Sequence, residues 1–278
     1  MLLLAAACST GDEPAADDGP VRPVTVAEAE RLANVRFRNF DAGSRKVTAM
    51  YTDQGHEVTL KGWFDYTTHT GYGLVSADGR PSARVVWDGR VIATTSGDRL
   101  GKPQTSLDGW RVGKLDPLSS PLAVVLTVLA GLGADRPENP LLIRQGGALW
   151  LREDAVGERP VTVFAGPVSP GGGDEAIPDD GAGGGAAPSD TARPGSARAD
   201  GEVTPEASAS TPTAIAPVDP DAAGIRYWVD QSGLAHRVDI RLGDDWAVVD
   251  LEHATWSVPP LLEDVDPRPS PETAEDDG

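Results

Sequence analysis

Four histidines are the side chains best suited to metal binding or acid–base chemistry, but their spacing supports neither. His56-Glu57 begins like the helical zinc motif of metalloproteases, yet Leu60 stands where the second histidine is required. His69, His236 and His253 have no second ligand two or four residues away. We therefore expect exposed histidines in turns or on sheet faces, and no metal site.

Glycine-rich and nucleophile motifs are also incomplete. The stretch Gly97–Lys102 is one residue short of a phosphate-binding loop, and Pro103 follows it where serine or threonine is needed. Gly71-Tyr72-Gly73 and Gly131-Leu132-Gly133 lack a third glycine, and no Gly-x-Ser-x-Gly string occurs. We expect no catalytic residues, no cofactor and no enzymatic activity.

The single cysteine, Cys8, follows a short apolar run and precedes an acidic segment. That run is far shorter than the about 20 residues that a membrane-spanning helix needs, but small residues before a cleavage site are typical of signal peptides. Ala5-Ala6-Ala7-Cys8 resembles a bacterial lipobox, in which the cysteine is diacylated and becomes the mature N-terminus. Ala5 stands where leucine is usual, and no basic residue precedes Leu2, so we expect the true start to lie further upstream.

This interpretation assigns residues 1–7 to the end of a signal peptide and 8–22 to the lipidated cysteine with a flexible tether. Two acyl chains anchor a protein stably to a membrane, whereas one does so only marginally. A diacylated Cys8 would therefore hold the protein on the outer face of the cytoplasmic membrane. The alternative is a cytosolic protein with an incidental thiol.

The net charge of −19 lies almost entirely in three segments. Residues 9–20, 168–221 and 261–278 carry net charges of −4, −8 and −6, so the rest of the chain is nearly neutral. Nucleic-acid binding requires a basic patch, which is missing, and we exclude it. One cysteine also excludes an internal disulfide.

The same composition predicts the domain organisation. Residues 168–221 contain no aromatic residue and no leucine, so they cannot bury enough apolar area to offset their ordering entropy, and we expect them to be disordered. The strands expected after them are too few for an independent domain. We therefore expect one discontinuous domain, 23–167 plus 222–259, and a disordered acidic tail at 260–278.

Most of this domain alternates polar and apolar residues between turn signals, as strands do. Asp78-Gly79 and Asp88-Gly89 suit the positive φ angles of tight hairpin turns, and Gln54-Gly55 and Gly71 are weaker turn signals of the same kind. Such short connections exclude a parallel sheet, whose crossovers need a dozen or more residues. The expected strands are Lys46–Thr52, His56–Tyr66, Thr70–Ala77, Ser82–Trp87, Arg90–Thr95, Ala148–Leu151, Val161–Phe164, Ile225–Val229, His236–Leu242 and Trp246–His253.

Two helices are predicted beside these strands. Val26–Phe40 has helix-forming residues and a cap at Thr25. Pro121–Gly133 is apolar on every side, starts with proline and ends with glycine. It is too short to cross a bilayer, so the sheet must enclose it. The expected fold class is α+β, with a single strongly curved antiparallel sheet, or half-barrel, and helices on its concave face.

Several strings carry a family resemblance: GHEVTLKGWFDY, RVVWDGRVIATT, LDGW, PLAVVLTVLAGLG, NPLLIRQGGALWL and YWVDQSGLAHRVDIRL. In this order they resemble the LppX/LprG family of bacterial cell-envelope lipoproteins, which is similar in fold to the LolA/LolB lipoprotein carriers. The resemblance covers 23–167 and 222–258. It implies a bent sheet whose concave side holds acyl chains, in an anchored protein that binds or transfers lipids or glycolipids. The insertion at 168–221 and the acidic tail depart from the family pattern.

The apolar helix and the resemblance together predict a lipid cavity. Its expected lining is Tyr51, Leu60, Phe64, Leu74, Leu122, Val125, Leu126 and Leu129. A filled core has the same sequence pattern as a hollow one, so both stay open. A hollow interior would favour binding of a lipid or glycolipid. A solid core with an exposed apolar rim would favour a non-enzymatic interaction or sensory module that binds a protein partner.

Overall fold

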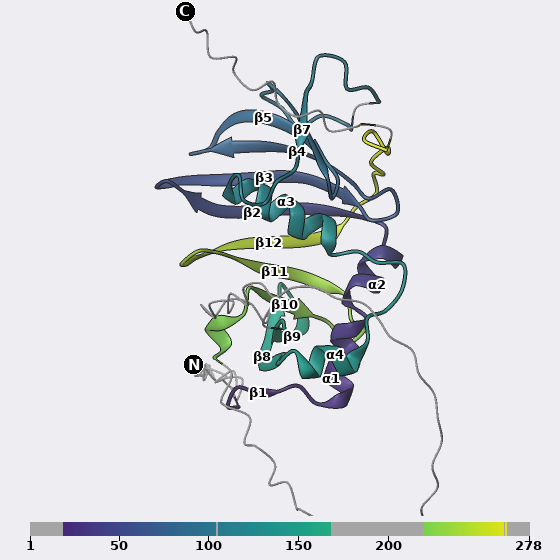
Figure 1. Ribbon diagram of the computed structural model, residues 1–278, viewed down its shortest axis with the longest axis vertical. Helices are drawn as coiled ribbons and strands as arrows, with labels where there is room; N and C mark the ends of the chain where they lie inside the picture. The colour runs from purple at the N-terminus through teal and green to yellow at the C-terminus, as the bar shows by residue number, and fades with distance from the viewer. Residues whose placement is uncertain (1–18, 104, 168–218, 264, 266–278) are drawn as a thin grey trace, which may run out of the picture. The chain divides into compact units, whose positions relative to one another are not determined.

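The computed structural model describes residues 19–103, 105–167, 219–263 and 265, all of which belong to one compact unit. Cys8 and most of the two segments predicted to be disordered, 168–221 and 260–278, lie outside the described residues, so the predictions on lipidation and disorder stay predictions there. Where these segments are described they are ordered: Pro220–Ala222 forms a 3₁₀-helix, and Leu262 is fully buried beside Val258. Within the described part, the strands form one twelve-stranded sheet in which neighbouring strands are antiparallel (Figure 1). The helices and strands are β1 (Arg22–Pro23), α1 (Val26–Ala33), α2 (Val35–Asp41), β2 (Ser44–Asp53), β3 (His56–Asp65), β4 (Thr70–Ala77), β5 (Arg80–Trp87), β6 (Val91–Thr95), β7 (Arg111–Lys114), α3 (Pro121–Gly131), α4 (Pro140–Gln145), β8 (Leu149–Val156), β9 (Arg159–Ala165), the 3₁₀-helix η1 (Pro220–Ala222), β10 (Ile225–Val229), β11 (Ala235–Leu242) and β12 (Asp245–His253).

The three C-terminal strands lie in the middle of the sheet. The strand order is β1-β8-β9-β10-β11-β12-β2-β3-β4-β5-β6-β7, so β10–β12 join the strands on either side of them. Phe164 of β9 pairs with Tyr227 of β10, and Val47 of β2 pairs with Leu251 of β12. The chain before the insertion and the chain after it therefore share one sheet. β1 and β7 are its two ends, so this antiparallel sheet is open and is not a closed barrel.

Two of the four predicted turn sites have the expected backbone. The φ angles are 48° and 73° at Asp78-Gly79 and 50° and 82° at Gln54-Gly55. The prediction for Asp88-Gly89 is wrong, because neither residue has a positive φ. The Asp88 carboxylate closes that turn instead, accepting hydrogen bonds from the backbone N–H groups of Arg90 and Val91, both at 2.6 Å. The prediction for Gly71 is also wrong, because this residue lies inside β4 without a positive φ, and His69 just before the strand has a φ of 50° instead.

The helix predicted over Val26–Phe40 is two helices, α1 and α2. Thr25 caps α1 as predicted: its Oγ1 accepts from the Glu28 N–H, and the Glu28 carboxylate accepts from the Thr25 N–H. Asn34 separates the two helices. Its side-chain amide donates to the Glu30 carbonyl at 2.7 Å, and such local bonds compete with the helical backbone pattern.

Helix α3 lies across one face of the sheet, over its central strands (Figure 1). It starts at Pro121 as predicted, after Ser120, whose Oγ accepts from the Ala123 N–H at 3.2 Å. It ends at Gly131, two residues before the predicted end. Four of its residues join the main core cluster of the sheet: Ala123, Val125, Leu126 and Leu129. That the helices cover a concave face stays a prediction.

Four short elements of the described chain were not predicted from the sequence. β1, β7, α4 and η1 contain two, four, six and three residues, too few to show a strand or helix period. A cap marks α4: the Asn139 Oδ1 accepts from the Leu141 N–H at 3.0 Å, next to Pro140 in the first turn.

Candidate functional site

The core beneath α3 brings together most of the side chains predicted to line a cavity. Leu122 is partly buried and packs against this core cluster. The members that are at most 5% exposed are Tyr51, Leu60, Phe64, Val125, Leu126 and Leu129. The strands and the helix thus supply one continuous apolar cluster.

Leu74 does not belong to this cluster. In the β3–β4 register, Leu60 lies opposite Val75, whereas Leu74 lies opposite Lys61. Because successive residues of a strand point to opposite faces, Leu74 lies on the other side of the sheet. Val75, which is 7% exposed, takes the position in the core that we assigned to Leu74. The prediction chose the wrong alternate residue of β4.

An aromatic group that sequence analysis missed lies in the same cluster. The ring centroid of Phe64 is 4.8 Å from that of Tyr66 and 5.7 Å from that of Trp87. A Cβ at Gly71 would come within 2.3 Å of the Trp87 indole, so only glycine lets this ring lie against the strand. The signal was present in the sequence, because a glycine such as Gly71 or Gly73 inside a strand marks a close approach.

Three polar atoms of this region have no hydrogen-bond partner among the described residues: Tyr66 Oη, Trp87 Nε1 and Thr127 Oγ1. The side chains of Tyr66 and Trp87 are fully buried. Burial also raises the pKa of the Tyr66 hydroxyl. A buried polar group without a hydrogen-bond partner costs about 1–3 kcal/mol. In an ordinary core most buried polar atoms have such a partner, and these three atoms do not.

The side chains of α3 and of the sheet beneath it pack into one buried cluster. Five cavities lie elsewhere on the described residues, and none of these five is lined by a residue of α3 or by any of the eight predicted residues. Val125, Leu126 and Leu129 are fully buried against the sheet. The hollow interior expected from the resemblance is therefore not seen in this arrangement of the helix.

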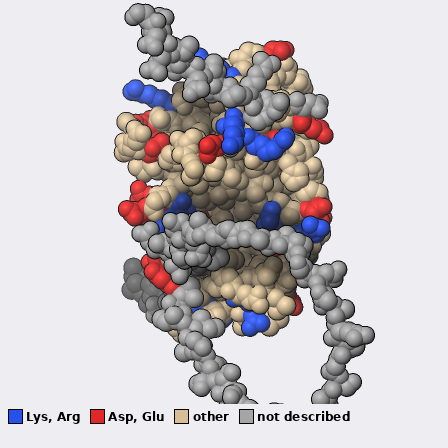
Figure 2. Space-filling model, in the orientation of Figure 1, with Lys and Arg blue, Asp and Glu red and all other residues tan. Residues whose placement is uncertain are grey.

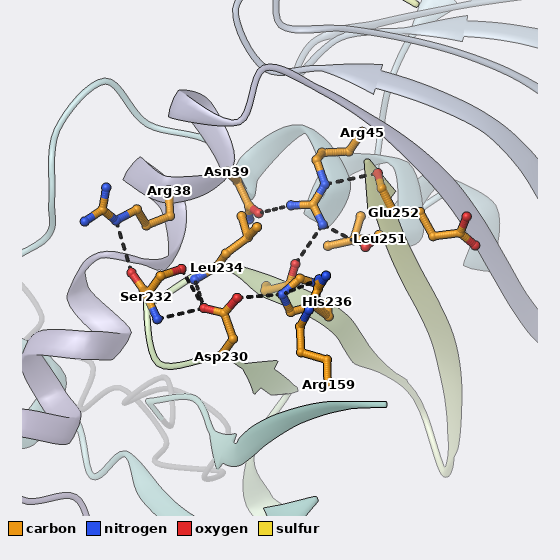
Figure 3. Close-up of polar contacts among 11 residues, drawn as sticks. Arg38, Asn39, Arg45, Arg159, Asp230, Ser232, Leu234, His236, Leu251 and Glu252 are labelled. Carbon is orange, nitrogen blue, oxygen red and sulfur yellow. Dashed lines mark hydrogen bonds and ion pairs between the residues drawn. The ribbon is translucent and has the colours of Figure 1, made fainter. Parts of the chain in front are cut away.

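A second candidate region is polar and centres on Arg45, which is 2% exposed (Figure 3). Its Nη1 donates to Asn39 Oδ1 at 3.0 Å, and its Nη2 donates to the carbonyls of Ala235 and Leu251 at 3.0 and 2.7 Å. Its Nε donates to the Glu252 carbonyl at 3.2 Å. These acceptors are all neutral, and no carboxylate of the described chain is ion-paired with it. Burial lowers the pKa of this guanidinium.

His236 lies beside this arginine and is 5% exposed, so the prediction of exposed histidines is wrong for it. Its Nε2 is 2.8 Å from Asp230 Oδ2, and its Nδ1 is 2.8 Å from Arg159 Nη1 (Figure 3). A guanidinium can only donate, so Nδ1 accepts and Nε2 carries the proton that is donated to Asp230. Burial lowers the pKa of His236, with the Asp230 hydrogen bond opposing it.

Arg159 and His236 line a cavity of about 740 Å³, together with Glu158, Asp250 and Glu252. Burial raises the pKa of the Asp250 carboxyl. Within the described residues, no three histidine, cysteine, aspartate or glutamate side chains gather closely enough to hold a metal ion. The cavity therefore offers hydrogen bonds and charge but no metal-ligand set.

The comparisons with known proteins add little to this geometry. No family model matches the chain, and no curated protein matches it. Among solved structures, it is similar to the crystal structure of LprF from Mycobacterium bovis, with 10% sequence identity, a TM-score of 0.38, and coverage of 85% of this chain and 95% of that one. A TM-score of this size does not establish a common fold. None of the helices in the described residues is long and apolar enough to cross a membrane.

Proposed function

We propose that the protein is a lipid-anchored protein of the bacterial cell envelope that binds the acyl chains of a lipid or glycolipid against α3. In this proposal Cys8 carries the anchor, the protein has no catalytic activity, and the bound lipid can be transferred to an acceptor. Support comes from the lipobox-like string before Cys8 and from the apolar helix, together with the family resemblance of the sequence.

The observation that carries the proposal is the composition of α3. Its sequence, PLAVVLTVLAG, has no charged residue, and Thr127 is its one polar side chain. The sheet covers one side of the helix, while Leu122, Val124 and Val128 remain only partly buried. In Figure 2 the middle of this face is uncharged and recessed, and charged residues lie around it. An apolar helix of this kind needs a cover, and acyl chains supply one.

The contacts of α3 would let the helix move away from the sheet, because its polar contacts to α2 are at its C-terminal end. Its C-terminal end is held by α2, because Arg36 Nε donates to the Gly131 carbonyl at 2.7 Å and Asn39 Nδ2 donates to the Leu132 carbonyl at 3.0 Å. The body of the helix meets the sheet through apolar side chains. Since buried side chains pack closely beneath the helix, we propose that α3 swings outward about this C-terminal attachment and admits the chains.

Displacement of α3 would place acyl chains on the aromatic group of Phe64, Tyr66 and Trp87. It would also give the unpaired Tyr66 Oη and Trp87 Nε1 access to the polar atoms of a lipid ester or hydroxyl. The proposal thus accounts for two buried polar atoms that the core leaves unsatisfied.

Uptake of a fluorescent acyl probe tests the proposal. The full chain with Cys8→Ser, which cannot be acylated, should bind the probe, and Val128→Asp on the outward side of α3 should abolish binding without unfolding the domain. Val112→Asp is the matched control, because Val112 is 38% exposed on the edge strand β7 and away from α3. Equal uptake by both aspartate variants would reject α3 as the site.

A second candidate function is an interaction module that binds a protein partner. The close packing of Val125, Leu126 and Leu129 against the sheet favours it. Failure of the unacylated chain to bind any acyl probe would leave this candidate in place of lipid binding.

A further inference from the structure

The tip of α4 exposes two consecutive leucines. Leu141 and Leu142 are 60% and 64% exposed, although Ile143 beside them is 7% exposed and belongs to the main core cluster. Two further apolar residues near the start of the described chain, Val21 and Val26, are 46% and 56% exposed. Adjacent exposed leucines on one short helix differ from the single apolar residues scattered over most surfaces and indicate a contact.

These residues lie where the N-terminal segment joins the fold. The Glu138 N–H donates to the Ala33 carbonyl at 2.9 Å, and the Val24 N–H donates to the Ala148 carbonyl at 3.2 Å, so α4 runs beside α1. Figure 1 shows α4, α1 and β1 at the same end of the sheet. Cys8 is 11 residues before Gly19, the first described residue. A chain of that length spans at most about 40 Å.

We propose that Leu141 and Leu142 insert into the surface of the lipid bilayer. This docking rests on the proposed anchoring at Cys8, because the anchor keeps α4 within one short tether of the membrane. Exposed arginines flank the leucines at Arg136 and Arg144, where guanidinium groups fit lipid phosphates. Of the neighbouring acids, Glu138 is paired with Arg36 at 3.0 Å, which leaves Asp135.

Vesicle partitioning of the full chain with Cys8→Ser tests the docking without the anchor. The vesicles contain phosphatidylcholine with phosphatidylglycerol, and binding is measured by sedimentation over a range of lipid concentrations. The double variant Leu141→Ser/Leu142→Ser should lower the partition coefficient by about tenfold or more, because it removes the apolar surface that two leucine side chains would bury in the bilayer. Leu118→Ser, at a leucine that is 94% exposed before α3, is the matched control and should change partitioning less than about twofold.

Equal partitioning of the double variant and its parent would overturn the docking proposal. So would a dimer of the parent that the double variant disrupts in the absence of vesicles, because the leucines would then bind a second copy. Acyl-probe uptake by the same variants separates this inference from the proposed ligand. The double variant should take up probe as its parent does, and a parent that docks on vesicles but takes up no probe would reject the ligand and keep the docking.

Discussion

The imidazole of His236 lies between a carboxylate and a guanidinium, with Asp230 Oδ2 2.8 Å from Nε2 and Arg159 Nη1 2.8 Å from Nδ1. Arg45, whose side chain is buried nearby, adds a second positive charge. In the neutral ring Nε2–H donates to Asp230 and Nδ1 accepts from Arg159, so a second ring proton, on Nδ1, would have no acceptor and would face Arg159. This arrangement disfavours protonation of His236, in agreement with its lowered pKa.

We predict that the free energy of unfolding decreases as pH falls below about 6.5, the ordinary pKa of histidine. Burial lowers the pKa of His236 in the folded state, so the unfolded chain takes up a proton that the folded chain does not. The stabilisation is complete above pH 6.5 and is lost as pH falls towards the lowered value. Urea unfolding between pH 7.5 and 5.5 measures it. His236→Gln should show a weaker pH dependence than the wild type, and His56→Gln, at an exposed histidine, should not; the same dependence in all three would contradict the prediction.

The buried guanidinium of Arg45 should contribute strongly to stability. Arg45→Met removes the donors for Asn39 Oδ1 and for three backbone carbonyls, and we expect a loss of about 2–5 kcal/mol because each unpaired buried acceptor costs about 1–3 kcal/mol. Arg38→Met is the control. That side chain is 43% exposed and donates one hydrogen bond, to the Ser232 carbonyl, so its loss should cost less than about 1 kcal/mol. Equal urea midpoints for the two variants would show that the Arg45 network does not hold the fold.

Gly71 should be intolerant of even one methyl group. Gly71→Ala places a Cβ 2.3 Å from the Trp87 ring, and we expect a destabilisation of about 1–3 kcal/mol with a change in tryptophan fluorescence. In Gly113→Ala, on the edge strand β7, the added Cβ has no atom within 4 Å, so stability and tryptophan fluorescence should both stay unchanged. A Gly71→Ala protein with wild-type stability would mean that Trp87 does not lie against β4.

Alternation and turn residues predicted much of the sheet. β4 and β10 have the predicted bounds, Thr70–Ala77 and Ile225–Val229, because each has a clear turn or irregular segment on both sides. Which residues of a strand face the core was harder to predict from the sequence. β4 carries Leu74 and Val75 side by side, and only the register with β3 decides which of them enters the core.

The candidate polar site could not be predicted, because its members are distant in sequence. Arg45, Arg159 and His236 come from three strands that meet only once the C-terminal strands lie between β9 and β2. Asp230-x₅-His236 offered a weak local signal, since a turn between them brings the two side chains together. Whether the core is filled also depends on side-chain packing that the apolar pattern does not determine.

Packing beneath α3 gives a fourth prediction. Val125 is fully buried against the sheet, so Val125→Trp should overpack the core and destabilise the domain by about 1–3 kcal/mol or more. Leu118→Trp, at the 94% exposed position, is the control and should leave the urea midpoint unchanged. A Val125→Trp protein of normal stability that no longer binds an acyl probe would reveal a hollow site where the structure has a filled one.

Native mass spectrometry of the purified full chain with Cys8→Ser, followed by organic extraction, tests lipid binding most directly. The chain is produced in a bacterium with a lipid-containing envelope and exported, so that its ligand is available. We predict a population heavier than the polypeptide by the mass of a lipid or glycolipid, which extraction releases and which Val128→Asp lacks. A single species with the mass of the bare polypeptide, unchanged after incubation with acyl lipids, would contradict the proposal that this protein binds lipid.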